Sequence, residues 1–368
     1  MELLKFELYK IFKQKTVYIT FFLVILFSTG FTFQLTEQWE KDLYKEWEGP
    51  ITAEKVKLAE EKNAVLMKKL EDAPDDEPFF FSERENAEMA VYEGVSWAAG
   101  VERNTKEYIK ELDRADASAP DKLEVAMLSK LDTSYFEYNV GPGKVIDFAS
   151  VLSIFITGSM LLIGLSAIYS QEYSSGVENY LLSAKKGRKQ LLWAKIGAAS
   201  IYTVVVVAAW ELFNLAWNTV QYGSEGWGTP FQHYFKYYFS PYDFTMLEYH
   251  LVQMAFHLLG AVSFAVVIVL VSSFSKNALI SFFVCSALFG MPFLVVEMLM
   301  LPEWLENIFM FSHIFTMNVE PLFNFFNTLN LFGTPVLFPF VAVVVMIGVS
   351  SVAVLVNLRY MKRKELSV

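Results

Sequence analysis

The sequence FASVLSIFITGSMLLIGLSAIYS, residues 148–170, contains no charged side chain. A helix needs about 20 consecutive apolar residues to cross the hydrocarbon core of a bilayer. Lipid offers no hydrogen-bond partner to free backbone groups, so a segment that crosses it must be helical. Residues 148–170 therefore predict a transmembrane helix, and the segments on either side of it can be assigned in turn.

Five further apolar segments of similar length lie on both sides of residues 148–170. They are residues 17–35, 196–220, 251–272, 279–301 and 335–358. Hydrophobic residues make up 54% of the chain and charged residues only 19%, which is below the usual quarter for soluble domains. We therefore expect an all-α integral membrane protein with six transmembrane helices. Residues 17–35 are expected to stay as a signal anchor, because no small-residue cleavage pattern follows them.

Lysine and arginine in short loops indicate which ends of the spans face the cytoplasm. The N-terminal residues 1–16 carry four lysines, the loop 171–195 carries five basic residues, and the tail 359–368 carries four. The alternate loops, 221–250 and 302–334, hold only Lys236. This distribution predicts a multi-pass protein of the cell membrane with both termini in the cytoplasm.

Residues 1–16 form a separate feature in front of the first span. Leu4, Leu8, Ile11 and Phe12 recur at helical spacing with lysines around them. This pattern predicts an amphipathic helix that lies in the membrane interface. The alternative is a basic flank that only sets the topology.

The long block 36–147 is polar and acidic, with 15 Lys and Arg against 27 Asp and Glu, a net charge of −12. Helix-like runs cover about 52–71, a segment from Ser82 to about residue 115, and a third that follows Pro120 and ends before residues 141–143. Glu85 lies three residues after Ser82, the spacing of a capping box. Strand-type alternation is absent, so we expect an all-α extracytoplasmic domain. It either contacts an extracytoplasmic peptide or lipid ligand or is a solvated insertion without one; the acidic charge disfavours anionic partners.

Residues 302–334 are too aromatic for a solvated loop, but prolines and glutamates interrupt them. Two short re-entrant helices, which enter the outer leaflet and return, would suit this pattern, since protein must cover non-helical backbone at that depth. The alternative is a helix that lies flat on the membrane, with Trp304 as its interface anchor.

Three ionisable residues, Glu211, His257 and Glu297, lie within or near the apolar segments. Ionisable groups are costly in the membrane and often mark a transport route. We expect Glu211 to be the nearest of the three to the middle of the membrane and the best candidate to line a substrate pathway. The alternatives are structural hydrogen bonds for Glu211 and His257, and contact with water for Glu297.

The sequence has no sign of ATP-hydrolysing or other catalytic machinery. Its one Gly-Lys pair, Gly143-Lys144, lacks the upstream glycine of a phosphate-binding loop and is followed by Val145. There is no HExxH motif, no metal-type cluster and no nucleophile–base set, so we expect no catalytic residue, no metal site and no enzymatic activity. Cys285 is the only cysteine, which excludes an intramolecular disulfide.

The loop QEYSSGVENYLLSAKKGRKQLLWAK, residues 171–195, carries more than a topology signal needs. It has an acid at Glu172, a Ser174-Ser175-Gly176 turn, a short apolar helix that ends in Leu-Leu-Ser, then Arg188 and a Leu-Leu pair before Lys195. This order resembles the first cytoplasmic loop of ABC-2-type permeases, the membrane subunits of type-2 ABC exporters. The long block after the first span is similar to that of Bacillus-type members of the family.

The resemblance implies a bacterial cytoplasmic-membrane exporter that contains two permease subunits, identical or paralogous, and two separate ABC ATPase subunits. ATP and Mg would bind to those ATPases, and no cofactor or nucleic acid to this chain. The loop would be the coupling helix, with Glu172 and Glu178 paired to basic residues at the rim of an ATPase groove. The residues that the resemblance assigns to ATPase coupling are Glu172, Ser174, Ser175, Gly176, Val177, Glu178, Tyr180, Leu181, Leu182 and Arg188.

The leading hypothesis is thus an exporter permease for an amphipathic peptide, an antibiotic or a lipid-like molecule. The second is an ATP-independent sensor or scaffold protein that acts through its extracytoplasmic helical domain. A secondary transporter comes third, because the two halves of the sequence show no repeat of the kind common in such folds.

Overall fold

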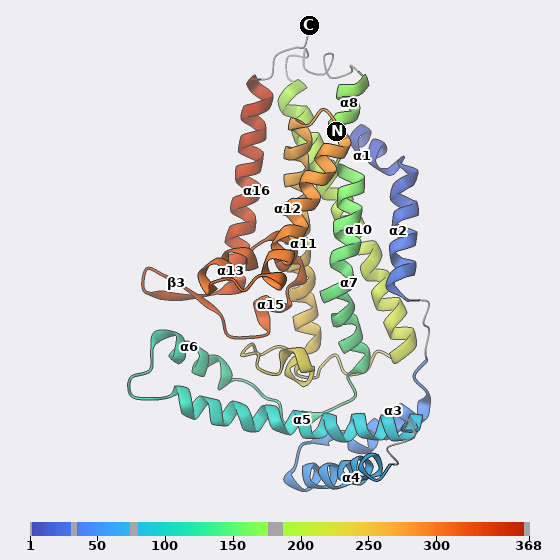
Figure 1. Ribbon diagram of the computed structural model, residues 1–368, viewed down its shortest axis with the longest axis vertical. Helices are drawn as coiled ribbons and strands as arrows, with labels where there is room; N and C mark the ends of the chain where they lie inside the picture. The colour runs from blue at the N-terminus through green and yellow to red at the C-terminus, as the bar shows by residue number, and fades with distance from the viewer. Residues whose placement is uncertain (1, 31–34, 74–79, 176–186, 364–368) are drawn as a thin grey trace.

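The structure is a computed structural model that describes residues 2–30, 35–73, 80–175 and 187–363 (Figure 1). It is mostly helical, at 77%. A bundle of long helices runs along the long axis, and a helical domain lies across one end of it. Helix α1 and the end of α16 lie at the opposite end, which we call the terminal end of the bundle.

Among the described residues, five helices are each long and apolar enough to span a membrane, which agrees with an all-α membrane protein. They are α7 (Val140–Leu165), α10 (Gly187–Tyr222), α11 (Met246–Phe274), α12 (Ala278–Met298) and α16 (Phe338–Arg363). Five of the six predicted spans are thus matched by a long apolar helix.

The first predicted span, residues 17–35, differs from the structure. Helix α2 (Lys15–Ser28) has 14 residues and a length of about 21 Å, which is less than the hydrocarbon thickness of about 30 Å. It qualifies as a span only together with α1 (Glu2–Phe12), to which it is joined at a bend of 55°. Helix α1 confirms the helix predicted at the N-terminus.

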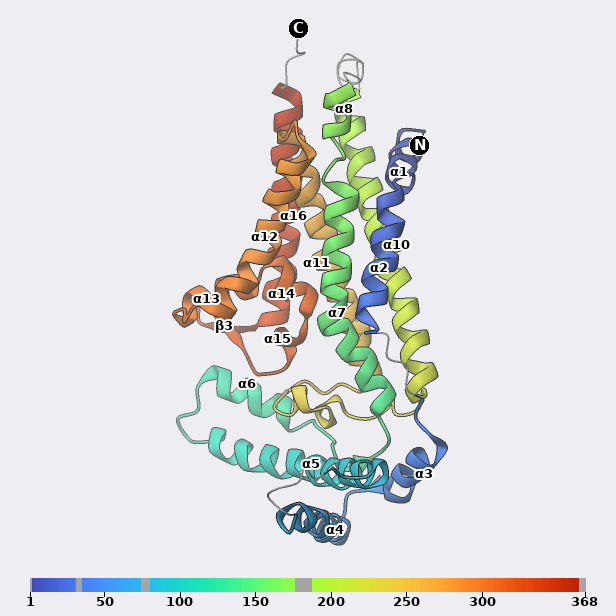
Figure 2. The ribbon, with the colours of Figure 1, turned by 45° about the vertical axis from the view of Figure 1, so that its right-hand side comes forward.

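Helix α7 lies in the centre of the bundle and α12 at its edge (Figure 2). In the most apolar 18-residue stretch of each helix, 72% of α7 but only 17% of α12 is buried. The side chains of α7 pack with those of α10 and α11 in one large apolar core, which also includes Ile11 of α1 and Val17 of α2. The most buried helix is the one that leads from the helical domain to the polar loop 171–195.

The helical domain comprises residues 37–139. Its elements are α3 (Gln38–Trp47), α4 (Ala53–Glu71), α5 (Glu83–Leu112), α6 (Ala119–Leu128) and the two-residue strands β1 (Gly49–Pro50) and β2 (Tyr135–Phe136). The predicted capping box of Ser82 and Glu85 is confirmed at the start of α5. The side chains of Trp47, Tyr92 and Phe136 help to form the domain's own apolar core. The strand pair β1–β2 was not expected from the sequence.

The start of α7 corrects the sequence prediction, which began this span at residue 148 and left residues 141–143 outside any helix. Helix α6 ends at Leu128, and Gly141, Pro142 and Gly143 form the first turn of α7 instead. Proline is tolerated in a first turn because its missing N–H would have no helical partner there. At Gly141 there is no room for a side chain, because the carbonyl oxygen of Gly223 lies where a Cβ would be.

Residues 302–337 form short helices and a hairpin beside the half of the bundle nearest the helical domain (Figure 1). The elements are α13 (Glu303–Met310), α14 (His313–Asn318), α15 (Glu320–Phe323), β3 (Thr328–Leu331) and β4 (Thr334–Leu337). Helix α14 is buried and packs closely on α11, where Gly260 leaves room for Met317. Short 3-10 turns, η1 (Phe231–His233) and η2 (Phe235–Tyr237), precede α11. Whether these helices enter a membrane stays a prediction.

The close approach at Gly141 can be tested by Gly141→Ala. The new methyl group would collide with a backbone oxygen, and overpacking of this kind typically destabilises a protein by about 1–3 kcal/mol. We expect a lower thermal unfolding temperature for the purified protein in detergent. Gly348→Ala is the matched control, since nothing lies within 4 Å of its Cβ position. Equal unfolding temperatures for both variants and the wild type would contradict this packing.

Candidate functional site

Four charged side chains meet at the terminal end of the bundle, where α1 and α8 (Ser170–Ser175) lie beside α10 (Figure 1). The Nζ atom of Lys195 lies 3.0 Å from Oε2 of Glu7 and 2.7 Å from Oε1 of Glu172. The Nζ atom of Lys10 lies 2.7 Å from Oε2 of Glu7 and 2.5 Å from Oε1 of Glu172. We call these four residues the charge cluster. Its two carboxylates and two ammonium groups balance in charge.

The charge cluster is buried on the side of Lys195. This side chain is 0% exposed and that of Glu7 is 1% exposed, whereas Lys10 lies at the edge of the cluster. Lys195 also donates a hydrogen bond to the carbonyl oxygen of Ile168 at 2.7 Å, and its Nζ lies 4.7 Å from the centre of the Tyr169 ring. The three donors of an ammonium group thus all have acceptors, as a buried lysine requires.

The local sequence explains why these residues meet. Glu7 follows Leu4 by three positions and precedes Ile11 by four, so it lies on the apolar face of α1. That face packs against α10 rather than only against lipid, and it brings the carboxylate to Lys195 near the start of α10. Glu172 comes from α8, which follows the end of α7 after residues 166–169. Three segments that are distant in sequence are therefore joined by ion pairs.

The position of Glu172 differs from the expected one at the rim of an ATPase groove, because its carboxylate is buried against Lys10 and Lys195 of its own chain. The sequence interpretation did not assign Glu7, Lys10 or Lys195 to a site. One signal was present: an acid on the apolar stripe of an amphipathic helix needs a buried cation.

The other residues assigned to ATPase coupling are described only in part. Arg188 donates hydrogen bonds to the carbonyl oxygens of Met361 at 3.4 Å and Lys362 at 3.0 Å, which ties the start of α10 to the end of α16. Ser174 and Ser175 are the last residues of α8, and nothing is described of their side chains. The positions that lie outside the described residues are Gly176, Val177, Glu178, Tyr180, Leu181 and Leu182.

Glu211 takes part in a polar network near the end of the bundle that faces the helical domain. Its Oε1 lies 2.8 Å from Nε2 of His250, a residue in the second turn of α11. The side-chain amide of Gln253 donates to Ile146 and Ser150, so its oxygen faces Nδ1 of His250 and must accept from it. A proton therefore lies between Glu211 and His250, whichever of the two atoms carries it.

His257 lies in a second network, between α7, α10, α11 and α14. Its Nδ1 lies 2.9 Å from the carbonyl oxygen of Met317, which can only accept, so Nδ1 donates. Thr157 Oγ1 can then donate to Nε2 at 2.9 Å while it accepts a hydrogen bond from Trp210 Nε1 at 3.0 Å. A neutral imidazole satisfies every one of these bonds, which favours the structural alternative for His257.

Glu297 lies apart from Glu211 and His257, exposed in the last turn of α12. The three residues proposed for a substrate pathway are thus not brought together: Glu211 and His257 belong to different hydrogen-bond networks, and Glu297 lies on the surface.

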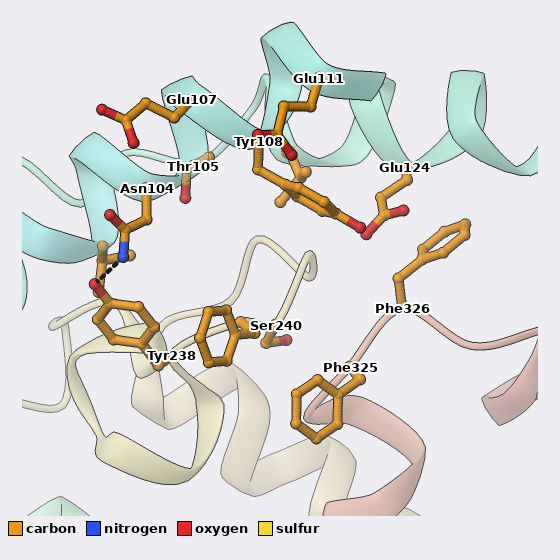
Figure 3. A pocket seen from close by; sticks show the side chains of 13 residues that line it. Asn104, Thr105, Glu107, Tyr108, Glu111, Glu124, Tyr238, Ser240, Phe325 and Phe326 are labelled. Carbon is orange, nitrogen blue, oxygen red and sulfur yellow. Dashed lines mark hydrogen bonds between the residues drawn. The ribbon is translucent and has the colours of Figure 1, made fainter. Parts of the chain in front are cut away.

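A cavity of about 550 Å³ lies between the helical domain and the bundle (Figure 3). Aromatic side chains from three segments line it: Tyr108 from α5, Tyr238 and Phe239 from the segment after η2, and Phe325 from the segment after α15. Glu124 of α6 points to the hydroxyl group of Tyr108 in this cavity. Burial raises the pKa of Glu124 from 4.5 to about 7, opposed by the Tyr108 hydrogen bond and assisted by the charge of Asp121.

No protein-family model matches the chain, and no curated protein is significantly similar to it. The resemblance to ABC-2-type permeases therefore rests on the loop 171–195 and the arrangement of the apolar segments.

The charge cluster predicts a specific pattern of stability. Lys195→Met leaves two buried carboxylates with one cation, and the loss of one partner from a buried ion pair typically destabilises a protein by about 3–5 kcal/mol. Lys195→Met combined with Glu7→Gln leaves Lys10 paired with Glu172, so we expect this double variant to regain part of the lost stability. Thermal unfolding in detergent measures both.

Lys189→Met is the control for the cluster variants, since it removes a charge from an exposed position on the same helix. It should unfold like the wild type. If Lys195→Met were as stable as Lys189→Met, the charge cluster would not hold these helices together.

Glu124 predicts a pH dependence of stability. Its pKa is higher in the folded protein than in the unfolded chain, so the folded state loses stability as the pH rises from about 4.5 through about 7. We expect Glu124→Gln to be more stable than the wild type at pH 8 and equal to it at pH 4. The difference between the two unfolding temperatures across this range isolates Glu124 from the other titrating groups. A difference that does not change with pH would contradict the assignment.

Proposed function

We propose that this chain is the membrane-spanning permease subunit of an exporter that is powered by ATP hydrolysed on a separate ATPase subunit. The observation that carries the proposal is the charge cluster, because it fastens both flanks of the polar loop 171–195 to the bundle. Glu172 comes before the segment 176–186 and Lys195 comes after it. A loop that only sets topology does not need such an attachment.

Force applied to the segment 176–186 would pass into the bundle through the hydrogen bonds and ion pairs on either side of it. On one side, α8 is bonded to α1 and α10 through Glu172, and to the end of α11 through the hydroxyl group of Tyr173, which donates to the carbonyl oxygen of Ser273 at 2.7 Å. On the other side, Arg188 links α10 to α16. An ATPase that moved this segment would therefore move several spans together, as coupled transport requires.

The orientation of the protein in the membrane is inferred from the distribution of basic residues. Loop 171–195, the N-terminal helix and the tail hold most of the basic residues outside the helical domain, and positively charged short loops remain in the cytoplasm. In this orientation the ATPase subunits bind at the terminal end of the bundle. The acidic helical domain lies outside the cell, where it faces the exported molecule.

The binding of an ATPase is the direct test. Tagged full-length chain purified from the membranes of its own cells is expected to bring with it a protein that has a phosphate-binding loop and hydrolyses ATP. Deletion of residues 174–183 should abolish this co-purification, because it removes the proposed coupling helix and leaves both partners of Lys195 in place.

The matched control is deletion of residues 328–337, which removes the same length of chain at the hairpin β3–β4. This variant should retain the ATPase. If no ATPase accompanies the wild type, or if the 174–183 deletion retains it, the proposed function is wrong.

The cavity under the helical domain gives some support to the second hypothesis, a membrane sensor. A sensor would bind its ligand in the absence of ATP hydrolysis and would retain its response after deletion of residues 174–183. The same deletion therefore separates the two functions.

A further inference from the structure

We propose that the cavity between the helical domain and the bundle binds a small amphiphile that combines a cationic amine with an aromatic or apolar body. This site goes beyond the proposed function and does not depend on it. An exporter could bind its transported molecule in this cavity, and a sensor could bind its signal there. Its volume of about 550 Å³ falls within the range of about 300–1,000 Å³ that is typical of small-molecule sites.

The charge of the cavity selects a cation. Three glutamates line it, Glu107 and Glu111 near its exposed side and Glu124 deeper, and no lysine or arginine is among its lining residues. Glu124 is only 8% exposed and makes no ion pair with a basic residue in the described part of the chain. Arg103 acts on the charge of Tyr238 and Arg114 on that of Asp121, and neither contributes to the pKa of Glu124.

The state of Glu124 supports this selection. Burial disfavours its ionised form and raises its pKa to about 7, so the free protein holds a carboxylate that lacks a counter-ion. A ligand ammonium beside it would supply the missing positive charge next to a carboxylate that is only 8% exposed. An anionic ligand would instead add a second buried negative charge.

The aromatic lining selects an apolar body next to the cation. Phe239 and Phe325 stack with ring centres 6.2 Å apart and are 63% and 50% exposed. Tyr108 forms part of the same surface, so aromatic faces and a carboxylate occur together in the cavity (Figure 3). Aromatic faces attract ammonium groups as well as apolar surface.

The geometry of the cavity is held by contacts between the domain and the bundle. The side-chain amide of Asn104 on α5 donates to the hydroxyl group of Tyr238 at 2.8 Å. The rings of Tyr238 and Trp97 pack together with their centres 4.4 Å apart. Ser240 donates to the carbonyl oxygen of Phe323 at 2.6 Å, which fixes the segment that carries Phe239 next to the one that carries Phe325. The walls are thus positioned before any ligand binds, which lowers the cost of binding.

A charge series of one molecular shape tests the inference. We would measure binding of 4-phenylbutylammonium, 4-phenylbutanol and 4-phenylbutyrate to the full-length chain in nanodiscs of zwitterionic phospholipid at pH 8, by saturation-transfer NMR with empty nanodiscs subtracted. The ammonium compound should bind at least about tenfold more tightly than the alcohol, since hydrogen bonds between charged groups are stronger than those of a neutral hydroxyl group. The carboxylate should not bind at millimolar concentration.

Two variants locate the binding. Glu124→Gln keeps the shape of the side chain and should weaken binding of the ammonium compound about tenfold without changing that of the alcohol. Glu60→Gln makes the same change at an exposed position on α4, outside the cavity, and should bind like the wild type. Phe325→Ala should weaken both the ammonium compound and the alcohol, because it removes apolar surface.

The inference is overturned if the ammonium compound does not bind at up to 10 mM, if it binds no better than the alcohol, or if Glu124→Gln binds it as the wild type does. An unfolding temperature of Glu124→Gln at pH 8 that is at least as high as that of Glu60→Gln ensures that lost binding is not lost folding. None of these outcomes depends on an ATPase. A negative result would therefore reject the ligand site without bearing on the proposed function, which the co-purification experiment tests.

Discussion

The ammonium group of Lys195, buried between the carboxylates of Glu7 and Glu172, is the interaction on which the terminal end of the bundle depends. A lysine that is 0% exposed is stable only when every donor has an acceptor and its charge is balanced. Helix α1, helix α8 and the start of α10 must therefore stay together for Lys195 to keep its hydrogen-bond acceptors. Interfacial amphipathic helices bind through apolar area and attraction to anionic lipids. Helix α1 is in addition fixed to the bundle by ion pairs within the chain.

The charge cluster also attaches the polar loop 171–195 to the bundle. Both flanks of residues 176–186 are bound to the bundle, one through Glu172 and Tyr173 and the other through Lys195 and Arg188. The helical domain lies at the far end, and α7 runs from it to this attachment through the centre of the bundle. A movement at the loop would thus reach the helical domain through the most buried helix, a direct physical basis for coupling between the two ends.

The sequence predicted the long apolar helices, the N-terminal helix and the start of α5 well, because each depends on a local signal: a charge-free run, a helical repeat of leucines, or a capping box. Bounds that depend on tertiary contacts were wrong. Residues 141–143 look like a helix terminator, yet they begin α7 because Gly141 fits closely against the Gly223 carbonyl. Helix α2 also ends before the predicted bound of residue 35, at Ser28.

The candidate sites were less predictable, since each unites residues that are far apart in the chain. Lys195 looked like one more basic residue of a cytoplasmic loop until Glu7 and Glu172 were found on either side of it. Glu211 was singled out by its place in an apolar run, whereas its partner His250 lies 39 positions further along the chain. The cavity draws its walls from α5, α6 and two separate loops, and no local pattern relates them.

Hydrogen–deuterium exchange of the backbone amides of α1 tests the central claim most directly. In the wild type, residues 2–12 should be protected because Glu7 and Lys10 hold α1 on the bundle. In Glu172→Gln, which removes one carboxylate and keeps its shape, exchange in α1 should accelerate by about tenfold or more, since a buried charge loses its partner. The amides of α12, which has no residue in the charge cluster, should exchange as before. Unchanged protection of α1 in Glu172→Gln would contradict the account.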